Sequence, residues 1–473
     1  MKKLKLSQIA KALNAEYNVE SEFCGVCIDT RKITPGCLFV CIKGERFDAH
    51  QFANEALEKG AAAVMIHEDI KVNGAYVKVA DTSKALLALG GYYRSLFDIP
   101  VVALTGSVGK TTTKEFTSLV VASKYKTVKT QGNLNNEIGL PQTLFQIDED
   151  TEAAVVEMGM NHFGEIHRLV TATQPTLALI TNIGVSHIEN LGSRQGILKA
   201  KLEILDGLKE GSPLIINGDN DMLKTVFDNE EICTKYRVIA FGIENEYNYH
   251  AENIKENDGS TSFDVSYISS RLVDEEDGPT AVFSVESQHI VIPTVGVHNV
   301  YNALAAFAVG IELDIQPEDI AKALSSYVPA GMRQRLNTVS GRTCIEDCYN
   351  ASPDSMRAAL GTLGNMKADR KFAVLGDMLE LGEYSKDAHL SVGKMAGENK
   401  IDCVLAYGSD AEYYVEGAKE SGVQTAILFD DKEKLSEYLA QNAMPGDAVL
   451  FKGSRGMKLE DVINSVYKRW ENQ

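Results

Sequence analysis

The chain has 473 residues, which is enough for two to four domains with separate cores, and its 44% content of hydrophobic residues is ordinary for a globular protein. Its 47 Lys and Arg are outnumbered by 66 Asp and Glu, which gives a formal net charge of −19. This balance argues against sequence-independent binding to nucleic acid or to an anionic membrane, because both need a basic face. A locally basic phosphate pocket stays compatible with it.

The N-terminal segment MKKLKLSQIAKALNAEYNV places lysines before a helix-period pattern that polar residues interrupt, and no apolar signal-peptide region follows. No later stretch approaches the roughly 20 apolar residues of a membrane span. We therefore expect a soluble, cytoplasmic protein without membrane insertion, acting as a monomer. The eight cysteines are expected to be reduced thiols.

Four of these cysteines, Cys24, Cys27, Cys37 and Cys41, have the spacing of a metal knuckle. They also alternate with Val, Ile, Leu and Phe in two short runs typical of strands, CGVCID and CLFVCIKG. Because cysteine packs as a small hydrophobic side chain, we favour the interpretation as two buried strands.

The chain divides into three α/β blocks. Residues 1–97 combine predicted strands at 23–28, 37–42 and 62–66 with helical stretches at 51–59 and 83–97, which indicates a small α/β domain. Residues 98–313 open with the apolar run IPVVALTG and the helical KTTTKEFTSLVVAS. Further strands are predicted at 153–158, 176–181, 213–216 and 237–241, with helical segments between several of them. Strands spaced by helices predict a parallel, doubly wound sheet.

Between about residues 247 and 295 the pattern changes to polar/apolar alternation, in SFDVSYI, AVFSVES and HIVIPTV, which predicts antiparallel strands appended to that sheet. Residues 314–473 again alternate strands with helices, with strands predicted at 344–346, 372–375, 404–407, 426–429 and 448–451. A helix is expected to begin with Ser352 as N-cap and Pro353 in its first turn. This block predicts a Rossmann-like domain. Ligands bind outside the carboxyl ends of such strands, so the two sheets are able to face each other across a nucleotide.

The strongest motif is TGSVGKTTTKE at 105–115, between a strand and a helix. Gly106 and Gly109 allow backbone N–H groups to approach a phosphate, Lys110 reaches the β/γ-phosphates, and Thr111 offers its hydroxyl to Mg²⁺. The spacing GxxGK[ST] is shorter than the usual GxxxxGK[ST], because Leu104 stands where the outer glycine would be. A simple glycine turn is the structural alternative, and the strand–loop–helix context favours phosphate binding.

Two further residues follow neighbouring strands of the same block. Glu157 ends the strand at 153–158, where P-loop proteins hold Mg²⁺, and His187 lies in the loop after the strand at 176–181. Either could instead be a solvated loop side chain. The helix that follows carries Lys199 and Lys201, and lysines on helices are usually solvated.

Near residue 300, VGVHNVYNALAA puts Asn299 and Asn302 on one face of a helix start, where they either read an adenine edge or cap the helix. GMRQR supplies Arg333 between the second and third blocks, as a cation that clamps phosphate would be placed. DCYNASPDSM, LGDMLELG and FKGSRG lie at strand ends of the third block. We predict Asp347 near the nucleotide and Asn350 and Ser454 at the substrate, although each segment could be only a turn.

These segments together resemble the Mur ligase family along nearly the whole chain. GxxGKTT, GVHNVYNALAA and GMRQR are similar to the ATP-site, adenine-side and hinge segments of that family. DTRKITPGCLFVCIKGERFDAHQFANEAL resembles its UDP-binding domain. Within the family, GSVGKTTTKE, GNLNNEIGLPQTL, DCYNASPDSM and LGDMLELG are typical of the branch that adds D-Ala-D-Ala. The branch that adds the third amino acid is expected to carry GTNGKTT and a DYAH-like motif, and neither occurs here.

The resemblance implies an ATP- and Mg²⁺-dependent ligase that couples UDP-MurNAc-tripeptide to D-Ala-D-Ala through an acyl phosphate, in peptidoglycan precursor synthesis. It implies catalytic roles for Lys110, Glu157, His187, Lys201 and Arg333, with Lys201 at the position of a lysine that is often carbamylated. Mg²⁺ would contact Thr111, Glu157 and His187. The nucleotide would contact Gly106, Ser107, Val108, Gly109, Lys110, Thr111, Thr112, Asn299, Asn302, Arg333 and Asp347. The UDP-linked substrate would contact Thr30, Arg31, Asn133, Asn135 and Asn136.

Two alternatives stay open at this point. One is a Mur-type ligase of other specificity, either amino-acid-adding or related to folyl-polyglutamate synthase, although the UDP-type segment speaks against the folate enzyme. The other is a non-catalytic nucleotide switch, against which the presence of Lys110, Thr111, Glu157 and His187 argues.

Overall fold

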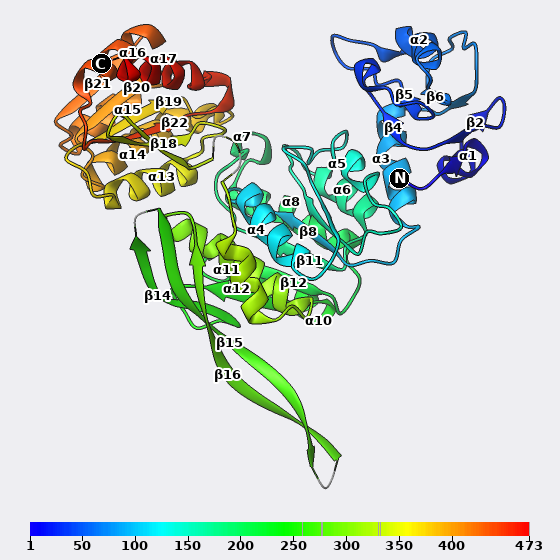
Figure 1. Ribbon diagram of the computed structural model, residues 1–473, viewed down its shortest axis with the longest axis horizontal. Helices are drawn as coiled ribbons and strands as arrows, with labels where there is room; N and C mark the ends of the chain where they lie inside the picture. The colour runs from blue at the N-terminus through cyan, green and yellow to red at the C-terminus, as the bar shows by residue number, and fades with distance from the viewer. Residues whose placement is uncertain (258, 276–277, 330, 332, 473) are drawn as a thin grey trace.

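The computed structural model describes residues 1–257, 259–275, 278–329, 331 and 333–472. In this part of the chain the strands form four sheets, arranged in an N-terminal, a central and a C-terminal domain (Figure 1). The N- and C-terminal domains lie at opposite ends of the central one. None of the helices in the described residues has the length and apolarity that a membrane crossing requires.

The N-terminal domain is built on a small five-stranded sheet in the order β2-β7-β6-β5-β4, beside a two-stranded sheet of β1 and β3. Its strands are β1 (Leu4–Lys5), β2 (Glu16–Tyr17), β3 (Glu22–Phe23), β4 (Val26–Cys27), β5 (Leu38–Val40), β6 (Ala63–Ile66) and β7 (Tyr76–Lys78). Its helices are α1 (Leu6–Leu13), α2 (Ala53–Glu58) and α3 (Thr82–Arg94). The predicted strand at 23–28 is therefore two short strands, and β7 was not predicted.

Three of the four cysteines in the knuckle-like spacing pack in the core of this domain. Cys27, Cys37 and Cys41 are buried among Phe39, Val64 and other apolar side chains, whereas Cys24 is exposed. Burial raises the pKa of the Cys41 thiol to about 12, so it stays protonated at neutral pH. No metal-ligating cluster in the described residues includes any of the four. The interpretation of these cysteines as core residues therefore fits the packing.

The central domain contains a nine-stranded sheet in the order β16-β15-β14-β13-β12-β11-β8-β10-β9. Its strands are β8 (Val101–Thr105), β9 (Thr127–Lys129), β10 (Ala153–Glu157), β11 (Leu177–Ile180), β12 (Pro213–Asn217), β13 (Arg237–Gly242), β14 (Tyr249–Asn257), β15 (Ser260–Glu275) and β16 (Gly278–Ile292). Strands β8 to β14 pair in parallel, and β14, β15 and β16 pair antiparallel, as the change in pattern predicted. The short strand β9 was not predicted.

Helices cover both faces of the parallel part. They are α4 (Lys110–Ala122), α5 (Leu140–Leu144), α6 (Glu165–Thr173), α7 (Ile188–Leu191), α8 (Arg194–Leu202), α9 (Asp221–Lys224), α10 (Glu230–Lys235), α11 (Val297–Glu312) and α12 (Pro317–Ser325). Alternate residues of one strand face different cores: Val102 and Leu104 pack with Phe116 of α4, whereas Val101 and Ala103 pack with Ile166 of α6. Near-continuous apolar strands are expected where both faces of a parallel sheet are covered.

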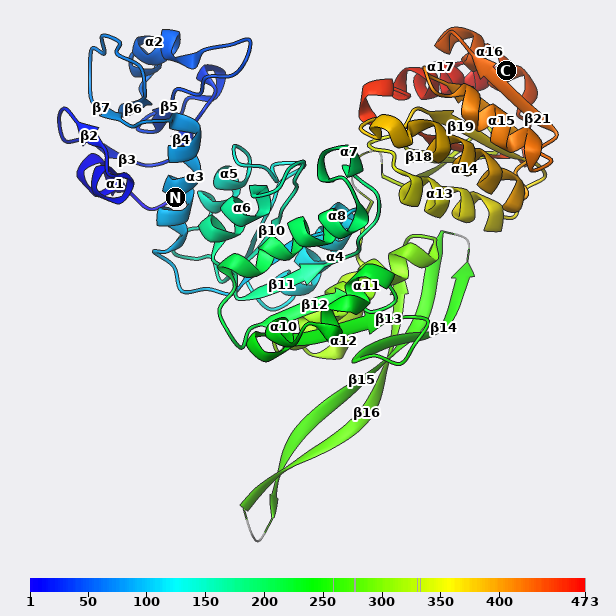
Figure 2. The same ribbon diagram turned by 180° about the vertical axis from the view of Figure 1, so that it is seen from behind.

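Strands β15 and β16 extend far beyond the body of the sheet as a two-stranded arm (Figures 1 and 2). Their register runs from Thr261 opposite Ile292 to Glu275 opposite Gly278. The alternation predicted the strands, but it carried no information on how far they extend past the neighbouring β14.

The core of the central domain continues past the predicted limit at residue 313. Ile320 and Leu324 of α12, together with Ile315 and Tyr327, pack with Phe116 and Val120 of α4. We therefore place α12 with the central domain. The sequence-based limit preceded this helix because the amphipathic pattern of α12 shows that it packs on something, but not on which sheet.

The C-terminal domain contains a six-stranded sheet in the order β17-β18-β22-β19-β20-β21, parallel except for β17. Its strands are β17 (Arg335–Val339), β18 (Arg342–Asp347), β19 (Lys371–Gly376), β20 (Cys403–Tyr407), β21 (Thr425–Phe429) and β22 (Ala448–Lys452). Its helices are α13 (Pro353–Asn365), α14 (Ser385–Glu398), α15 (Glu412–Glu420), α16 (Lys432–Asn442) and α17 (Glu460–Glu471). Ser352 is the N-cap of α13 and Pro353 lies in its first turn, as predicted.

Candidate active site

A cavity of about 410 Å³ lies between the central and C-terminal domains, at the carboxyl ends of strands from both sheets. Most of the predicted site residues line it: Ser107, Val108, Gly109, Lys110, Thr111, Thr112, Asn133, Asn135, Asn136, Glu157, His187, Asn299, Asn302, Arg333, Asp347 and Asn350. Gly106, Lys201, Ser454, Thr30 and Arg31 are not among its lining residues. Of the motif GMRQR, Met332 lies outside the described residues.

The phosphate loop joins β8 to α4, and two of its glycines are required by close contacts. Gly109 is the N-cap of α4 with φ of 81°, a left-handed conformation that favours glycine, and a Cβ there would lie 2.6 Å from Asn302 Oδ1. A Cβ on Gly106 would overlap Thr181 Oγ1. Asn182 Oδ1 accepts hydrogen bonds from the backbone N–H groups of Ser107, at 3.1 Å, and Val108, at 2.9 Å. Asn182 therefore holds the loop in shape from the next strand.

Lys110 lies in the first turn of α4 and turns back onto the loop. Its ammonium donates to the carbonyl oxygens of Gly106, at 2.8 Å, and Ser107, at 3.3 Å. Burial lowers the pKa of Lys110 from its ordinary value, and Glu157 opposes that effect. The cation is thus held within the loop that would surround a phosphate.

Glu157 ends β10 and is 2% exposed. Thr111 Oγ1 donates to its carboxylate at 3.1 Å, Asn135 Nδ2 donates at 2.8 Å, and Lys114 Nζ lies 3.6 Å from Oε2. A carboxylate and a hydroxyl at this distance are the hard oxygen donors that Mg²⁺ prefers, so Thr111 and Glu157 fit a magnesium ion beside the phosphate loop.

His187 precedes α7 in the same cavity, and its Nδ1 lies 3.0 Å from Glu380 Oε2 of the C-terminal domain. Burial, with Lys110 and Lys201 nearby, lowers the pKa of His187 to about 4. The imidazole is therefore neutral at pH 7, which is the form able to act as a ligand.

Lys201 lies on α8 behind the cavity and is 2% exposed, so the solvated-helix alternative does not hold for it. Burial, together with Lys110, lowers its pKa well below the ordinary value. Lys201 takes part in none of the side-chain hydrogen bonds and ion pairs between the described residues. By contrast, Lys199 on the same helix is exposed.

Asn299 and Asn302 are both buried in the first turns of α11, whose N-cap is Gly296, so neither caps the helix. Asn302 accepts a hydrogen bond from Thr113 Oγ1 at 3.0 Å and donates to Asn299 Oδ1 at 3.1 Å. Asn299 donates to Gln334 Oε1 at 2.8 Å, and His298 Nε2 lies 2.9 Å from the same oxygen. This network joins the phosphate-loop helix to the segment that enters the C-terminal domain.

The C-terminal wall of the cavity is built from β18, β22 and the segment before β17. Asp347 pairs with Lys452 at 2.6 Å, and Lys452 also donates to the carbonyl oxygen of Asn350 at 3.2 Å. The Arg333 guanidinium stacks over the Tyr349 ring at 4.1 Å. These groups place cationic charge opposite the phosphate loop.

Two sets of predicted residues lie elsewhere. Ser454 is buried and accepts a hydrogen bond from the backbone N–H of Leu379 at 2.9 Å. Arg31 lies in the N-terminal domain, where its exposed side chain pairs with Asp29 at 2.8 Å, and Thr30 precedes it. This separation from the cavity is compatible with their predicted role toward a uridine.

No role was predicted from the sequence for Lys114 or Gln334. Lys114 is fully buried and lies 3.1 Å from Glu115 Oε1 as well as near Glu157. Its place three residues after Thr111, almost one helical turn along α4, is a signal that could have found it. Gln334 has no comparable signal, because its importance comes from a left-handed backbone (φ 48°) that aims its amide at α11.

Comparison with known proteins identifies the family. Family models match residues 22–90 (Mur ligase family, catalytic domain), 104–310 (Mur ligase middle domain) and 333–455 (Mur ligase, glutamate ligase domain). A Bacillus subtilis (strain 168) protein named UDP-N-acetylmuramoyl-tripeptide–D-alanyl-D-alanine ligase is 40% identical over 448 residues, 93% of each chain. This chain belongs to the Mur ligase family. An Escherichia coli (strain K12) protein of the same name is 35% identical, with 98% of each chain covered.

Solved Mur ligases share the whole architecture. MurF from Acinetobacter baumannii superposes with a TM-score of 0.89 and 31% identity over 99% of both chains. MurF ligase from Thermotoga maritima, solved in complex with ADP, gives a TM-score of 0.81 and 28% identity, covering 95% of this chain and 98% of that one. The three-domain α/β fold expected from the sequence is therefore confirmed.

Proposed function

We propose that this Mur ligase joins the carboxylate of UDP-MurNAc-tripeptide to the amine of D-Ala-D-Ala, converting ATP to ADP and phosphate in peptidoglycan precursor synthesis. One observation carries the proposal: a phosphate loop, a buried carboxylate and cations of a second domain line one cavity. The Bacillus subtilis and Escherichia coli relatives named UDP-N-acetylmuramoyl-tripeptide–D-alanyl-D-alanine ligase match almost the entire chain at 40% and 35% identity, which supports specificity for D-Ala-D-Ala.

The loop residues and Lys110 bind and orient the phosphates of ATP. A peptide carboxylate is a poor electrophile, so its oxygen attacks the γ-phosphate, while Lys110 and Arg333 stabilise the charge that develops. Mg²⁺, when bound by Thr111, Glu157 and His187, supplies further neutralisation of the phosphates. Glu157 is already held by Thr111 and Asn135, so this site needs little rearrangement.

The resulting acyl phosphate is attacked by the free amine of D-Ala-D-Ala, and phosphate leaves. Water has to be excluded at this stage, because it would hydrolyse the intermediate. The cavity lies between two domains, so closure of the C-terminal domain over it would exclude water. We assign Asn350 and Ser454 to the amine substrate and Asp347 to the nucleotide on the same wall.

Lys201 acts as a carbamate in this proposal. A buried lysine without a polar partner, next to the cation of Lys110, is unfavourable in its charged form. Its lowered pKa leaves the neutral amine that CO₂ requires, and the adduct is an anionic oxygen donor suited to the metal side of the cavity. Glu157 and His187 alone would provide few ligands for the metal.

The other predicted site residues are assigned to parts of the substrates according to the domain in which they lie. Thr30 and Arg31 contact the uridine, Asn133, Asn135 and Asn136 contact the muramyl peptide, and Asn299 and Asn302 lie by the adenine. Asn302 donates to Asn299, and Asn299 donates to Gln334 in the segment before β17, so this chain of hydrogen bonds would also couple nucleotide binding to the C-terminal domain. We further propose a cytoplasmic monomer.

Product analysis tests the function. The full chain is incubated with ATP, Mg²⁺ and UDP-MurNAc-tripeptide, together with D-Ala-D-Ala, L-Ala-L-Ala or D-alanine alone, and the masses of the products are measured by mass spectrometry. We expect the mass of the pentapeptide product only with the D,D-dipeptide. A product formed with a single amino acid in place of the dipeptide, or no product at all, would contradict the proposal.

A further inference from the structure

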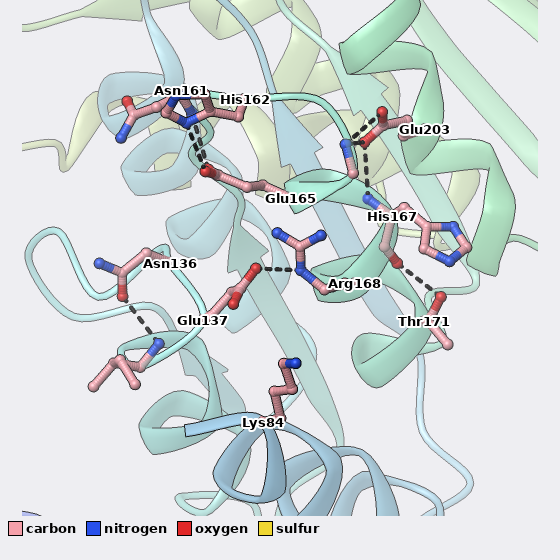
Figure 3. Close-up of polar contacts among 12 residues, drawn as sticks. Lys84, Asn136, Glu137, Asn161, His162, Glu165, His167, Arg168, Thr171 and Glu203 are labelled. Carbon is pink, nitrogen blue, oxygen red and sulfur yellow. Dashed lines mark hydrogen bonds and ion pairs between the residues drawn. The ribbon is translucent and has the colours of Figure 1, made fainter. Parts of the chain in front are cut away.

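Glu165, at the start of α6, is a cavity residue that the mechanism above leaves unused. Its Oε2 accepts a hydrogen bond from the backbone N–H of Asn161 at 2.9 Å, and its Oε1 lies 3.3 Å from His162 Nδ1. Figure 3 shows the carboxylate directed toward these two residues. The side chain is 23% exposed, so it is held in place but remains accessible.

The three acidic residues that line the cavity differ in their partners. Glu157 has Lys114 at 3.6 Å, and Asp347 has Lys452 at 2.6 Å. Glu165 has only the imidazole of His162, itself 65% exposed, and no lysine or arginine of the described residues pairs with it. A carboxylate offers about four acceptor positions, of which two are used here. Glu165 therefore keeps both charge and acceptor capacity for a cation.

The position of Glu165 indicates which substrate brings that cation. Glu165 lines the cavity together with Asn135, Asn136 and Asn161. Helix α6, which begins at Glu165, lies on the side of the central domain that faces the N-terminal domain (Figure 1). Helix α6 also packs on α3, where Arg94 Nε donates to the carbonyl oxygen of Thr173 at 3.1 Å. We therefore expect a ligand that extends from the N-terminal domain to the phosphate loop to pass Glu165, whereas the amine substrate is assigned to the opposite wall.

A second groove of about 960 Å³ adjoins this side, between α1, α3 and α6. Arg168, one turn beyond Glu165, pairs with Glu137 there, and Lys84 extends from α3 toward that pair (Figure 3). Lys11 lines the same groove. The groove is thus lined by three basic side chains, Lys11, Lys84 and Arg168, and one acidic side chain, Glu137, so it keeps net positive charge although Arg168 is paired with Glu137 and Lys84 lies 3.9 Å from Asp81. Lys110 lies in the cavity that Glu165 lines.

This order of charge matches the proposed peptide substrate. Its diphosphate and its second-residue carboxylate are anionic, and its reacting carboxylate is anionic. Its third residue carries a side-chain ammonium if that residue is lysine, and a side-chain ammonium beside a carboxylate if it is diaminopimelate. Resting on the proposed function, we infer that Glu165 binds the side-chain ammonium of the third peptide residue and so favours residues that carry such an ammonium at that position. Opposite charges in matching order favour one register of the substrate and disfavour others.

The test compares two substrates that differ only in this charge: UDP-MurNAc-tripeptide with L-lysine or with L-norleucine as third residue. With the wild-type chain, D-Ala-D-Ala and ATP, kcat/KM is expected to be about tenfold higher for lysine, corresponding to the ~1.4 kcal/mol of one charge-assisted contact. Glu165→Gln should remove this preference by lowering kcat/KM for lysine and leaving norleucine unchanged. Glu165→Asp should restore part of it.

Glu231→Gln, on exposed α10 at the other side of the domain, is the matched control and should keep the lysine preference. Equal kcat/KM for both substrates in the wild-type chain would overturn the inference without any variant. So would a Glu165→Gln chain in which both substrates lose activity equally, because that is the signature of a structural role at the start of α6. If the proposed function itself were wrong, the wild-type chain would ligate neither tripeptide, and this result differs from both outcomes above.

Discussion

The contacts within each wall of the cavity differ in number from the contacts that join the two walls. On the central wall, Lys110 and Glu157 are held by contacts within their own domain, to the loop carbonyls, Thr111 and Asn135. On the C-terminal wall, Asp347 and Lys452 likewise satisfy each other. Few polar contacts cross between the walls: His187 with Glu380, the backbone N–H of Val185 with Asp354 Oδ2 at 3.3 Å, and Gln334 with α11.

This difference indicates a division of labour. Lys110, Glu157, Asp347 and Lys452 each have partners within their own wall. The geometry of the phosphate loop therefore does not depend on the C-terminal domain. The contacts that do cross the cavity are few and polar, which permits the C-terminal domain to close over bound substrates and to reopen. Loss of a central-wall group should therefore abolish chemistry, whereas damage to a crossing contact should weaken only the closed arrangement.

Removing the cation of the phosphate loop should have the largest effect. Lys110→Ala is expected to lower kcat at least about a hundredfold, because it removes transition-state charge stabilisation. The fold should survive, since the lysine contacts only two loop carbonyls. Steady-state kinetics and a thermal melt measure the two effects, and near-normal turnover of a folded variant would refute the central-wall assignment.

Lys201→Ala is expected to reduce turnover strongly, with partial recovery on addition of acetate or formate as a small anionic oxygen donor. The reason is that the proposed carbamate, and not the ammonium, supplies the function. Lys199→Ala, two residues earlier on the exposed side of α8, is the control and should keep full activity. Unchanged turnover of Lys201→Ala would end the carbamate proposal.

A steric change at the crossing contact should have an intermediate effect. A Cβ on Gly184 would overlap Asp354 Oδ2, so in Gly184→Ala the Asp354 carboxylate has to move away and its hydrogen bond from the backbone N–H of Val185 across the cavity is lost. We expect kcat to fall several-fold while ADP affinity, measured by calorimetry, stays within about twofold. Gly361→Ala in α13, where the nearest atom lies 3.8 Å away, should change neither quantity. If Gly184→Ala lost ADP affinity instead, nucleotide binding would depend on the crossing contacts.

The smallest effect is expected in the N-terminal domain. Arg31→Ala removes an exposed guanidinium paired with Asp29, and should raise KM for UDP-MurNAc-tripeptide a few-fold without changing KM for ATP. Lys32→Ala is the neighbouring control. A change in KM for ATP alone would contradict the assignment of this domain to the UDP-linked substrate.

The sequence predicted the structural features that depend on a local pattern of residues. The glycine spacing of the phosphate loop, the strand–helix alternation and the Ser352-Pro353 helix start each depend on neighbours along the chain, and each element is present. The burial of Lys201 could not be read in this way, because Lys199 and Lys201 look alike until α8 packs on the sheet. The same holds for Gln334, whose partners lie on α11. The partners of Glu165 are local, but its position at the cavity depends on the packing of α6. Helix α12 lies beyond the predicted limit at residue 313, and its packing on α4 also depends on contacts that are distant along the chain.

The most direct test of the account is phosphate release by the full chain in the presence of ATP, Mg²⁺ and UDP-MurNAc-tripeptide, with and without D-Ala-D-Ala. If both walls are needed to complete the reaction, phosphate release should be slow without the dipeptide and should increase strongly when the dipeptide is added. One phosphate should be released for each peptide bond formed. Release that is equally fast without D-Ala-D-Ala would contradict the account, because the acyl phosphate would then be open to water.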